Sequence, residues 1–248
     1  GLFILRLDDT PRRHYVPEEF STIQEAINSS GIGDSIIVSE GTYYENIVIN
    51  NPPVINKDSC LDYHYCQEDG VEISQYFDDY VDTPWYTKDS ECFDLTIMGQ
   101  DSSNTIINGQ GIDRVIRIDG SSNDYYSKIS LRNFTIRNGY TTNRGAGIHA
   151  SDVNLFMDNL IISDNQVNAA QYSDVYGGGG LCIHGSVVLN EEHFNLITNS
   201  TIRNNVATNS AGGGVLLWDC QDPFGNLYDC FNTSNLIINN NQATNGGG

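Results

Sequence analysis

Hydrophobic residues in the second half of the chain fall into short segments, and each segment runs into a corner made of Asn or Gly. Four segments share this pattern, at 133–139, 159–165, 199–205 and 235–241. A glycine cluster follows each one, and the clusters end at Gly147, Gly180, Gly214 and Gly248, which are 33, 34 and 34 residues apart. Insertions in a solenoid project outward without disturbing the stacked strands, so regular strands joined by loops of variable length predict a solenoid.

The residues after each glycine cluster alternate between apolar and mixed positions. A period of two places three apolar pairs on the core side of the strands: Ala146 and Ile148, Leu181 and Ile183, Val215 and Leu217. The outward side then carries His149, His184 and Trp218, which we expect to align in one column at about 4.8 Å per coil. Such a column could bind a sugar by stacking and hydrogen bonding, or its members could lie half-exposed beneath a neighbouring loop.

Asparagine or glycine occupies the corner at the end of each segment. An asparagine side chain can bond to its own backbone, tolerates a positive φ and can bond to another amide stacked above it. We therefore interpret Asn165, Asn205 and Asn241, with Gly139 in the same register, as a structural ladder. The glycines at 177–180 form a coil corner rather than a phosphate-binding loop, because neither a Lys-Ser/Thr pair nor a helix follows them.

The beginning of the chain has a helical pattern instead. Apolar residues at 20, 23, 26 and 27 form a stripe with helical spacing. Ser21 is the expected N-cap, and Gln or Glu follows in the first turn. The pattern predicts a short amphipathic helix over residues 22–28 that covers the open end of the solenoid and buries Ile23 and Ile27.

Strand patterns follow this helix. They predict strands at 35–39, 46–50, 95–98, 105–107, 115–118 and 129–131, with a turn at Gly41 between the first two. Residues 51–94 form an insertion rich in Tyr and Cys, which we expect to be an ordered lobe on the flank of the solenoid. Nothing resembles a linker, so residues 1–248 are expected to form a single domain.

The composition agrees with an all-β repeat protein and excludes some partners. Hydrophobic residues make up 39% of the chain and charged residues only 18%. A net charge of −20 repels phosphate backbones and anionic membranes, so nucleic acid is not an expected partner. The same charge repels a bare polyuronate, so an acidic polysaccharide would need a cation such as calcium as a bridge. No segment approaches the ~20 apolar residues of a membrane span.

The six cysteines favour an oxidising, extracellular compartment. They form no CxxC pair and no Cys/His cluster with zinc spacing, so disulfides are the preferred interpretation. The cysteines expected in bonds are Cys60, Cys66, Cys92, Cys220 and Cys230. The last two bracket a short segment and are expected to pair with each other, while one bond is expected within the first three. Cys182 is expected to be free or bonded to the remaining cysteine.

Several segments resemble the opening of pectinesterase-like and other pectin-lyase-like β-helix proteins. They are FSTIQEAI at 20–27, GDSIIV at 33–38, GTYYENI at 41–47, LTIMG at 95–99 and NTIING at 104–109. From residue 133 onward, the Gly-Gly-Gly and Ile-x-Asn-Asn repeats are similar instead to surface β-helix proteins, including the polymorphic outer-membrane family. The resemblance implies an all-β, right-handed parallel β-helix. It does not imply one activity, because this superfamily includes lyases, esterases, hydrolases, adhesins and inert stalks.

Residues able to carry polysaccharide chemistry form no complete set in the sequence. A pectinesterase would need two catalytic aspartates and an arginine, and Asp222, in a Gln-Asp pair, is interpreted as a loop carboxylate. A lyase would need a basic residue beside calcium or a cationic clamp. The arginines at 114, 117, 132, 137, 144 and 203 are interpreted as solvent-facing, since Arg137 and Arg203 share a repeat position with Ser163 and Asn239. The aspartates at 78, 79 and 82 lack the EF-hand spacing and are interpreted as surface charge.

These observations favour a non-catalytic function. The expected protein is an extracellular or cell-surface β-helix with a structural, adhesive or filament-forming role, in contact with glycans along one face. Its expected partners are other copies of itself or cell-surface glycans, and an uncapped apolar coil end near 236–238 motivates the first of these. No cofactor is required, although calcium could contribute. The alternative is a carbohydrate-active enzyme, a polysaccharide lyase or a pectinesterase-like protein, with catalytic residues partly beyond residue 248.

Overall fold

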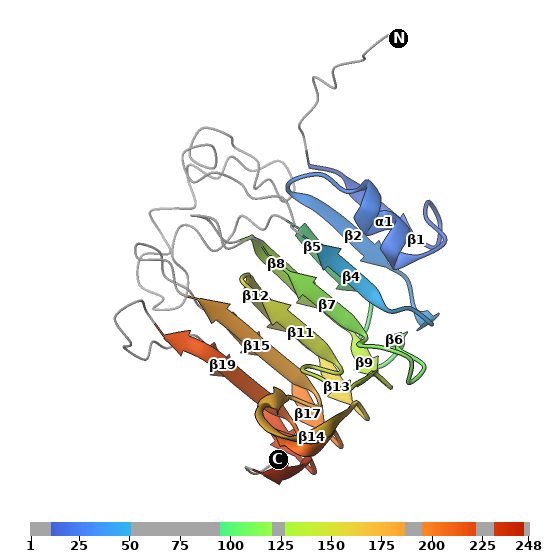
Figure 1. Ribbon diagram of the computed structural model, residues 1–248. Coiled ribbons are helices and arrows are strands. Elements are labelled where there is room, and N and C mark those ends of the chain that lie inside the picture. Colours follow the sequence, from blue (N-terminus) through green and yellow to red (C-terminus); the bar gives the residue numbers. More distant parts are fainter. Residues whose placement is uncertain (1–10, 51–94, 121–126, 187–194, 222–230, 246–248) are drawn as a thin grey trace, which may run out of the picture.

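The described part of the chain is a solenoid of parallel strands (Figure 1). The computed structural model describes residues 11–50, 95–120, 127–186, 195–221 and 231–245. Each strand pairs in parallel with its equivalents in neighbouring coils, and a full coil runs through four sheets in the order A, B, D and C. The fold class predicted from the sequence, a right-handed parallel β-helix, is therefore confirmed.

The strands are short and distribute over the four sheets as follows. Sheet A contains β1 (Arg13–Val16), β2 (Asp34–Val38), β5 (Leu95–Gly99), β8 (Lys128–Arg132), β12 (Asn154–Asp158), β16 (Asn195–Thr198) and β20 (Phe231–Ser234). Sheet B contains β3 (Gly41–Tyr43), β6 (Thr105–Asn108), β9 (Thr135–Arg137), β13 (Ile161–Ser163), β17 (Thr201–Arg203) and β21 (Ile237–Asn239). Sheet C contains β4 (Ile47–Asn50), β7 (Ile116–Asp119), β11 (Ile148–Ser151), β15 (Leu181–Ser186) and β19 (Val215–Gln221). Sheet D contains β10 (Tyr140–Thr141), β14 (Gln166–Gly177), β18 (Val206–Ala211) and β22 (Gln242–Asn245).

The core is built from columns of apolar side chains, and in sheet B isoleucine fills one column from β9 to β21. In sheet B, Ile136, Ile162 and Ile202 occupy matching positions in successive strands, and all three are fully buried. The next residue of the column, Ile238, keeps 44% of its surface exposed because no described coil covers it. Burial of one such side chain stabilises a fold by about 1.5–3 kcal/mol, so each coil depends on its neighbours for a core.

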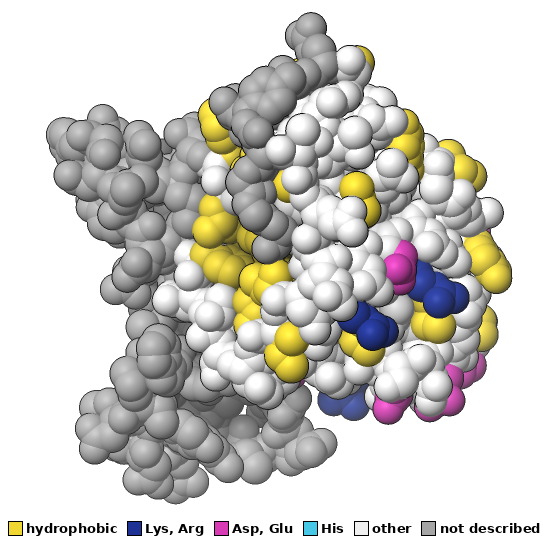
Figure 2. All heavy atoms as spheres, turned by 90° about the horizontal axis from the view of Figure 1, so that it is seen from below, with side chains coloured by type: hydrophobic (Ala, Val, Ile, Leu, Met, Phe, Trp, Pro, Cys, Tyr) yellow, Lys and Arg dark blue, Asp and Glu magenta, His cyan; other side chains and the backbone are white. Residues whose placement is uncertain are grey.

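Hydrophobic side chains also reach the surface around this last described coil. Figure 2 views the molecule from that side and shows apolar patches there. Leu217, Ile237 and Ile238 are the large apolar residues of the last strands that are exposed. The expected contact with other copies of the chain stays a prediction.

The asparagine ladder is confirmed at the corner between sheets B and D. Asn165 Oδ1 accepts a hydrogen bond from the backbone N–H of Gly139 at 2.8 Å. Asn205 Oδ1 accepts bonds from the backbone N–H and the side-chain amide of Asn165, at 3.0 and 2.9 Å. Asn241 Oδ1 binds Asn205 in the same way, at 2.9 Å to both groups. The ladder therefore joins four coils through side chains that are buried at Asn165 and Asn205.

A second set of asparagines turns the chain between sheets A and B. Asn133, Asn159, Asn199 and Asn235 all have positive φ values, between 48° and 61°. Asparagine is one of the few residues other than glycine that adopts this conformation readily. Asn159 Nδ2 donates to Asn133 Oδ1 at 2.9 Å, and Asn235 Nδ2 donates to Asn199 Oδ1 at 3.0 Å. The repeated Asn at the start of each segment thus has a conformational cause.

Glycine is required at the corner between sheets D and C. Gly178 has a φ of +67°, a left-handed conformation that side chains strain. Gly180 faces the asparagine ladder, and a Cβ atom placed on it would lie 2.8 Å from Asn205 Nδ2 and 2.8 Å from the Gly214 carbonyl oxygen. The glycine cluster is therefore a coil corner, as predicted, and the ladder sets its composition.

The predicted capping helix is present as α1 (Ile23–Ser29), which lies over the first coil beside β1, β2 and β4 (Figure 1). Ile23 is fully buried and Ile27 packs against the core while partly exposed. Thr22 is the N-cap and accepts a bond from the Glu25 N–H at 3.1 Å. The N-cap predicted from the sequence was wrong, because the hydroxyl of Ser21 bonds to the Glu25 carboxylate instead.

The first turn of α1 is also fixed by a distant carboxylate. Glu45 accepts hydrogen bonds from the backbone N–H groups of Ile23 and Gln24, at 2.9 and 3.0 Å. These N–H groups have no partner inside the helix, and a carboxylate is favourable at its positive end. The GTYYENI segment thus positions the cap on the first coil.

Among the described strands before residue 100, two were not predicted. Residues Gly41–Tyr43 form β3 and pair with β6, where the sequence suggested only a turn. Residues Arg13–Val16 form β1 and pair with β2. The buried carboxylate of Asp34 holds this strand, because it accepts a bond from the Arg12 N–H at 2.7 Å and lies 2.9 Å from His14 Nε2.

Other predictions fall on parts of the chain that are not described. The insertion at 51–94, the aspartates within it, and Asp222 all lie outside the described residues. So do Cys60, Cys66, Cys92 and Cys230, and the side chain of Cys220, so the expected disulfides stay predictions. Cys182 is free and buried, which is one of the two alternatives expected for it. Over the described ranges, no helix has the length and hydropathy that would let it cross a membrane.

Candidate functional site

The predicted binding residues all lie on the outward side of sheet C, but not in one column. His184 aligns with Trp218 on one side and with Ser151 on the other. His149 aligns with Cys182, one column away. The predicted single column is therefore wrong in its register, while the binding role assigned to these residues stays a prediction.

The reason for this error lies in the period of a strand. The predicted alignment matched Ala146 with Leu181, whereas the structure matches Ile148 with Leu181. An offset of two residues leaves every side chain on the same side of the sheet, so alternation alone cannot reveal it. Ala146 is buried in a separate small cluster with Val167 and Ala207.

Arginines surround this outward surface. The Nε of Arg114 donates to the Arg144 carbonyl oxygen at 2.7 Å, and its guanidinium lies 3.8 Å from the Asp113 carboxylate. Arg117 lies on β7 and forms an ion pair of 2.6 Å with Asp119. Burial lowers the pKa of Arg114, which keeps its charge at neutral pH. The interpretation of these arginines as solvent-facing filler fails at Arg114, whose side chain is only 15% exposed.

Arg144 stacks on an aromatic ring. Its guanidinium carbon lies 5.3 Å from the centre of the Trp218 ring, which is within the range of a cation–π interaction. Stacking engages the flat face of a guanidinium, while its N–H donors lie in the plane of the group. An arginine beside an indole combines guanidinium N–H donors, which suit a carboxylate, with an adjacent apolar surface.

His149 is a neutral, buried imidazole in this cluster. Burial, aided by the charge of Arg114, lowers the pKa of His149 to about 4. Its Nδ1 lies 3.9 Å from an Asp119 carboxylate oxygen and finds no hydrogen-bond partner among the described residues. At neutral pH the ring therefore adds no charge to the surface, and its Nδ1 is itself buried.

Cys182 and His184 lie beside these residues on the outward side of sheet C. Cys182 points to the outward side yet is fully buried, and burial raises the pKa of its thiol to about 12. It is an apolar packing residue rather than a nucleophile. His184 Nδ1 lies 3.2 Å from the Ser151 hydroxyl.

We name the surface formed by Arg114, Arg117, Arg144, His149 and Trp218 the sheet C surface.

This set offers cations, an indole and a neutral imidazole, which suits an anionic and partly apolar ligand. Nowhere in the described ranges do three or more His, Cys, Asp and Glu side chains gather as a possible metal site. A second Gln-Asp pair occurs at 100–101, and Asp101 uses its carboxylate to accept the Ser103 N–H at 2.6 Å within a turn. Its role there is to form the turn.

One sequence signal could have indicated the sheet C surface. Six of the twelve Lys and Arg residues lie between positions 114 and 144, in a chain with a net charge of −20. That clustering marks a local basic region. The coil register decides which members face the same side, and three of the six, Arg114, Arg117 and Arg144, do so.

The fold and the site define a class of protein, a parallel β-helix with a basic and aromatic outward surface. No protein-family model and no curated protein matches the sequence. Among solved structures, the chain is similar to a pectin methylesterase in complex with a hexasaccharide, with 12% identity and a TM-score of 0.35. The match covers 84% of this chain and 66% of that enzyme, so the chain spans less than two thirds of the enzyme's length.

Proposed function

We propose that this chain is an extracellular or cell-surface β-helix that binds acidic glycans through the sheet C surface. The observation that carries the proposal is the stack of Arg144 on Trp218, 5.3 Å from guanidinium to ring centre. A uronic acid offers both features that such a stack recognises, a carboxylate and a sugar ring with apolar C–H faces. An adhesive role on a surface follows from binding of this kind.

The net charge of the chain does not prevent this. Charges farther away than about 8 Å are largely screened at physiological ionic strength, so a ligand responds mainly to nearby groups. Near the sheet C surface, Arg114 and Arg117 are already matched by Asp113 and Asp119 at 3.8 and 2.6 Å. Because these two carboxylates are neutralised, the guanidinium of Arg144 is expected to bind a uronate without added metal.

A direct test compares hexagalacturonate with an uncharged hexasaccharide of β-1,4-linked glucose. By calorimetry in the presence of EDTA, we expect the sheet C surface to bind the acidic sugar and Arg144→Ala to weaken that binding at least about fivefold. Arg203→Ala is the matched control, because Arg203 is an exposed arginine on sheet B. Unchanged affinity in Arg144→Ala, with a folded protein by circular dichroism, would refute the proposal.

A second candidate function is an enzyme acting on the same class of polymer. One observation favours it: His149 is a neutral imidazole, 13% exposed, that lies beside an arginine surface with its Nδ1 3.9 Å from Asp119. A neutral imidazole near a bound uronate could take the C5 proton while the glycosidic C4–O bond breaks, so that a C4–C5 double bond forms and the leaving oxygen takes a proton from solvent. Incubation with polygalacturonate, monitored near 235 nm for unsaturated products and by a reducing-end assay, separates the two. Product formation that His149→Gln abolishes would establish the enzyme.

A further inference from the structure

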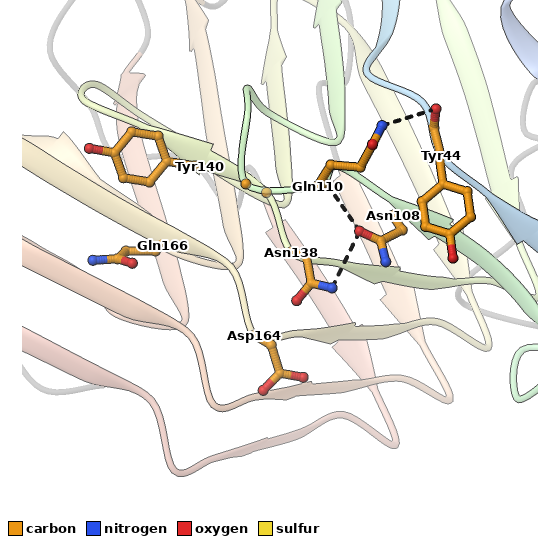
Figure 3. A pocket seen from close by; sticks show the side chains of 9 residues that line it. Tyr44, Asn108, Gln110, Asn138, Tyr140, Asp164 and Gln166 are labelled. Atoms are coloured by element: carbon orange, nitrogen blue, oxygen red, sulfur yellow. Dashed lines mark hydrogen bonds between the residues drawn. The ribbon is translucent and has the colours of Figure 1, made fainter.

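A hollow opens at the corner between sheets B and D, away from the sheet C surface. It has a volume of about 440 Å³. Two tyrosines contribute to it, Tyr44 just after β3 and Tyr140 at the start of β10. In Figure 3 these rings stand at opposite ends of the hollow, with amide side chains between them. The lining residues come from four successive coils, so the hollow runs along the axis of the helix.

The hollow exists because sheet D does not extend into the first two coils. There, the link between β6 and β7 takes the place of a strand, with φ values of +60° at Gln110 and +70° at Gly111. This link is held to the next coil, because Gly111 N–H donates to the Asn138 carbonyl at 2.7 Å and Tyr140 N–H donates to the Asp113 carbonyl at 3.0 Å. The floor of the hollow is therefore fixed by backbone bonds.

The amides in the hollow are oriented before any ligand arrives. Asn108 Oδ1 accepts bonds from the Gln110 N–H at 2.9 Å and from Asn138 Nδ2 at 3.3 Å. Gln110 Nε2 donates to the Tyr44 carbonyl at 3.4 Å. Gln166 lines the opposite side (Figure 3). A row of amides offers donors and acceptors together, which is what sugar hydroxyls need, since each hydroxyl is both.

We propose that this hollow binds an uncharged oligosaccharide, with Tyr44 and Tyr140 contacting sugar rings and the amides of Asn108, Asn138 and Gln166 bonding hydroxyls. Among the described residues that line it, Asp164 alone is charged, so an anionic ligand finds no cation there. A single carboxylate is a poor site for a divalent cation. The ligand class therefore differs from that of the sheet C surface, and the inference does not rest on the function proposed for that surface.

Tyr44 provides a clean test because it is 63% exposed and its removal should not disturb the core. The probes are uncharged hexasaccharides of glucose, mannose and xylose, titrated into the intact chain and followed by NMR. For at least one of them, Tyr44→Ala should raise Kd roughly three- to tenfold, and Tyr44→Phe should retain most of the affinity. Gln166→Ala should also weaken binding.

Matched controls locate the binding. Tyr15 is likewise an exposed tyrosine, at 38%, but it lies on β1 of sheet A, so Tyr15→Ala should leave Kd unchanged. Arg144→Ala should also leave it unchanged, since Arg144 belongs to the sheet C surface. The inference is wrong if no uncharged hexasaccharide binds at millimolar concentration, if Tyr15→Ala weakens binding as much as Tyr44→Ala, or if Arg144→Ala abolishes it.

Discussion

Single asparagines join neighbouring coils. Asn205 is fully buried, its Oδ1 accepts two bonds from Asn165, and its Nδ2 donates to the Ile162 carbonyl at 3.0 Å and to Asn241 Oδ1 at 2.9 Å. All of its side-chain polar atoms are thus satisfied inside the core. A buried polar group left without its partner costs about 1–3 kcal/mol, so the ladder is sensitive to the loss of one member.

Asn205→Ala should therefore lower the free energy of unfolding by about 2–5 kcal/mol, because it leaves the Asn165 N–H and the Ile162 carbonyl without side-chain partners. Urea denaturation followed by circular dichroism measures this. Asn239→Ala is the control, since Asn239 is exposed on β21 and should change stability by no more than about 0.5 kcal/mol. Equal effects of the two substitutions would contradict a structural role for the ladder.

His149 links stability to pH. Because its pKa falls from 6.5 to about 4 on folding, the unfolded chain binds more protons between these values. The contribution of His149 to the free energy of unfolding is fully present above pH 6.5 and is lost as the pH falls toward 4. Between pH 7 and pH 5 the loss amounts to about 2 kcal/mol.

His149→Gln should remove this component. Carboxylates titrate in both proteins, so the quantity to measure is the difference between wild type and variant in urea unfolding at pH 7 and pH 5. We expect wild type to lose about 2 kcal/mol more than the variant over that interval. If wild type and variant lost the same free energy of unfolding between pH 7 and pH 5, burial would not lower the pKa of His149.

At the scale of elements, the glycine corners and the asparagine ladder pack against each other and depend on each other. Gly180 lies where sheet D turns into sheet C, and the space that its missing Cβ would fill is taken by Asn205 Nδ2 and the Gly214 carbonyl, each at 2.8 Å. Neither neighbour can move away easily, because Asn205 Nδ2 is bonded to Asn241 Oδ1 and the Gly214 carbonyl accepts backbone bonds from the coil before it. The glycine and asparagine repeats therefore occur together.

Gly180→Ala should destabilise the protein by about 2–3 kcal/mol through overpacking. Gly185→Ala tests the same change five residues later on β15, where an added Cβ would meet nothing within 4 Å. That variant should be neutral or slightly more stable, since alanine restricts the unfolded chain. Thermal unfolding distinguishes the two, and a neutral Gly180→Ala would show that the corner is loosely packed.

At the scale of the whole molecule, the negative net charge destabilises the compact folded state. A net charge of −20 over 248 residues creates self-repulsion that the folded state concentrates. Salt shortens the range of that repulsion from about 30 Å at 0.01 M to about 10 Å at 0.1 M. Ion pairs such as Arg117 with Asp119 oppose this effect, but exposed pairs contribute only about 0–1 kcal/mol.

Raising NaCl from 10 to 300 mM should therefore increase Tm by a few degrees, because screening relieves repulsion more than it weakens ion pairs. Differential scanning calorimetry at a fixed protein concentration measures this, and light scattering at each salt concentration controls for association. A lower Tm at high salt would mean that the surface ion pairs dominate.

The sequence by itself determined the class of fold and its repeating parts. Stacked strands need an apolar residue at the same place in every coil, and Ile136, Ile162, Ile202 and Ile238 fill that place in each repeated segment. The buried ladder and the capping helix were predictable for the same reason, since corners and open ends impose local chemistry on the chain. These features depend on neighbours that repeat.

Only the tertiary structure decided which outward residues meet. An offset of two residues preserves alternation, so the pairing of His149 with Cys182 could not be derived from the pattern. Arg144 contacts Trp218 although they are 74 positions apart, and the hollow between Tyr44 and Tyr140 depends on where sheet D begins. Outward side chains are not constrained by a shared core, so their arrangement follows from the register and the loops. That is the physical reason why the fold could be predicted and the binding surfaces could not.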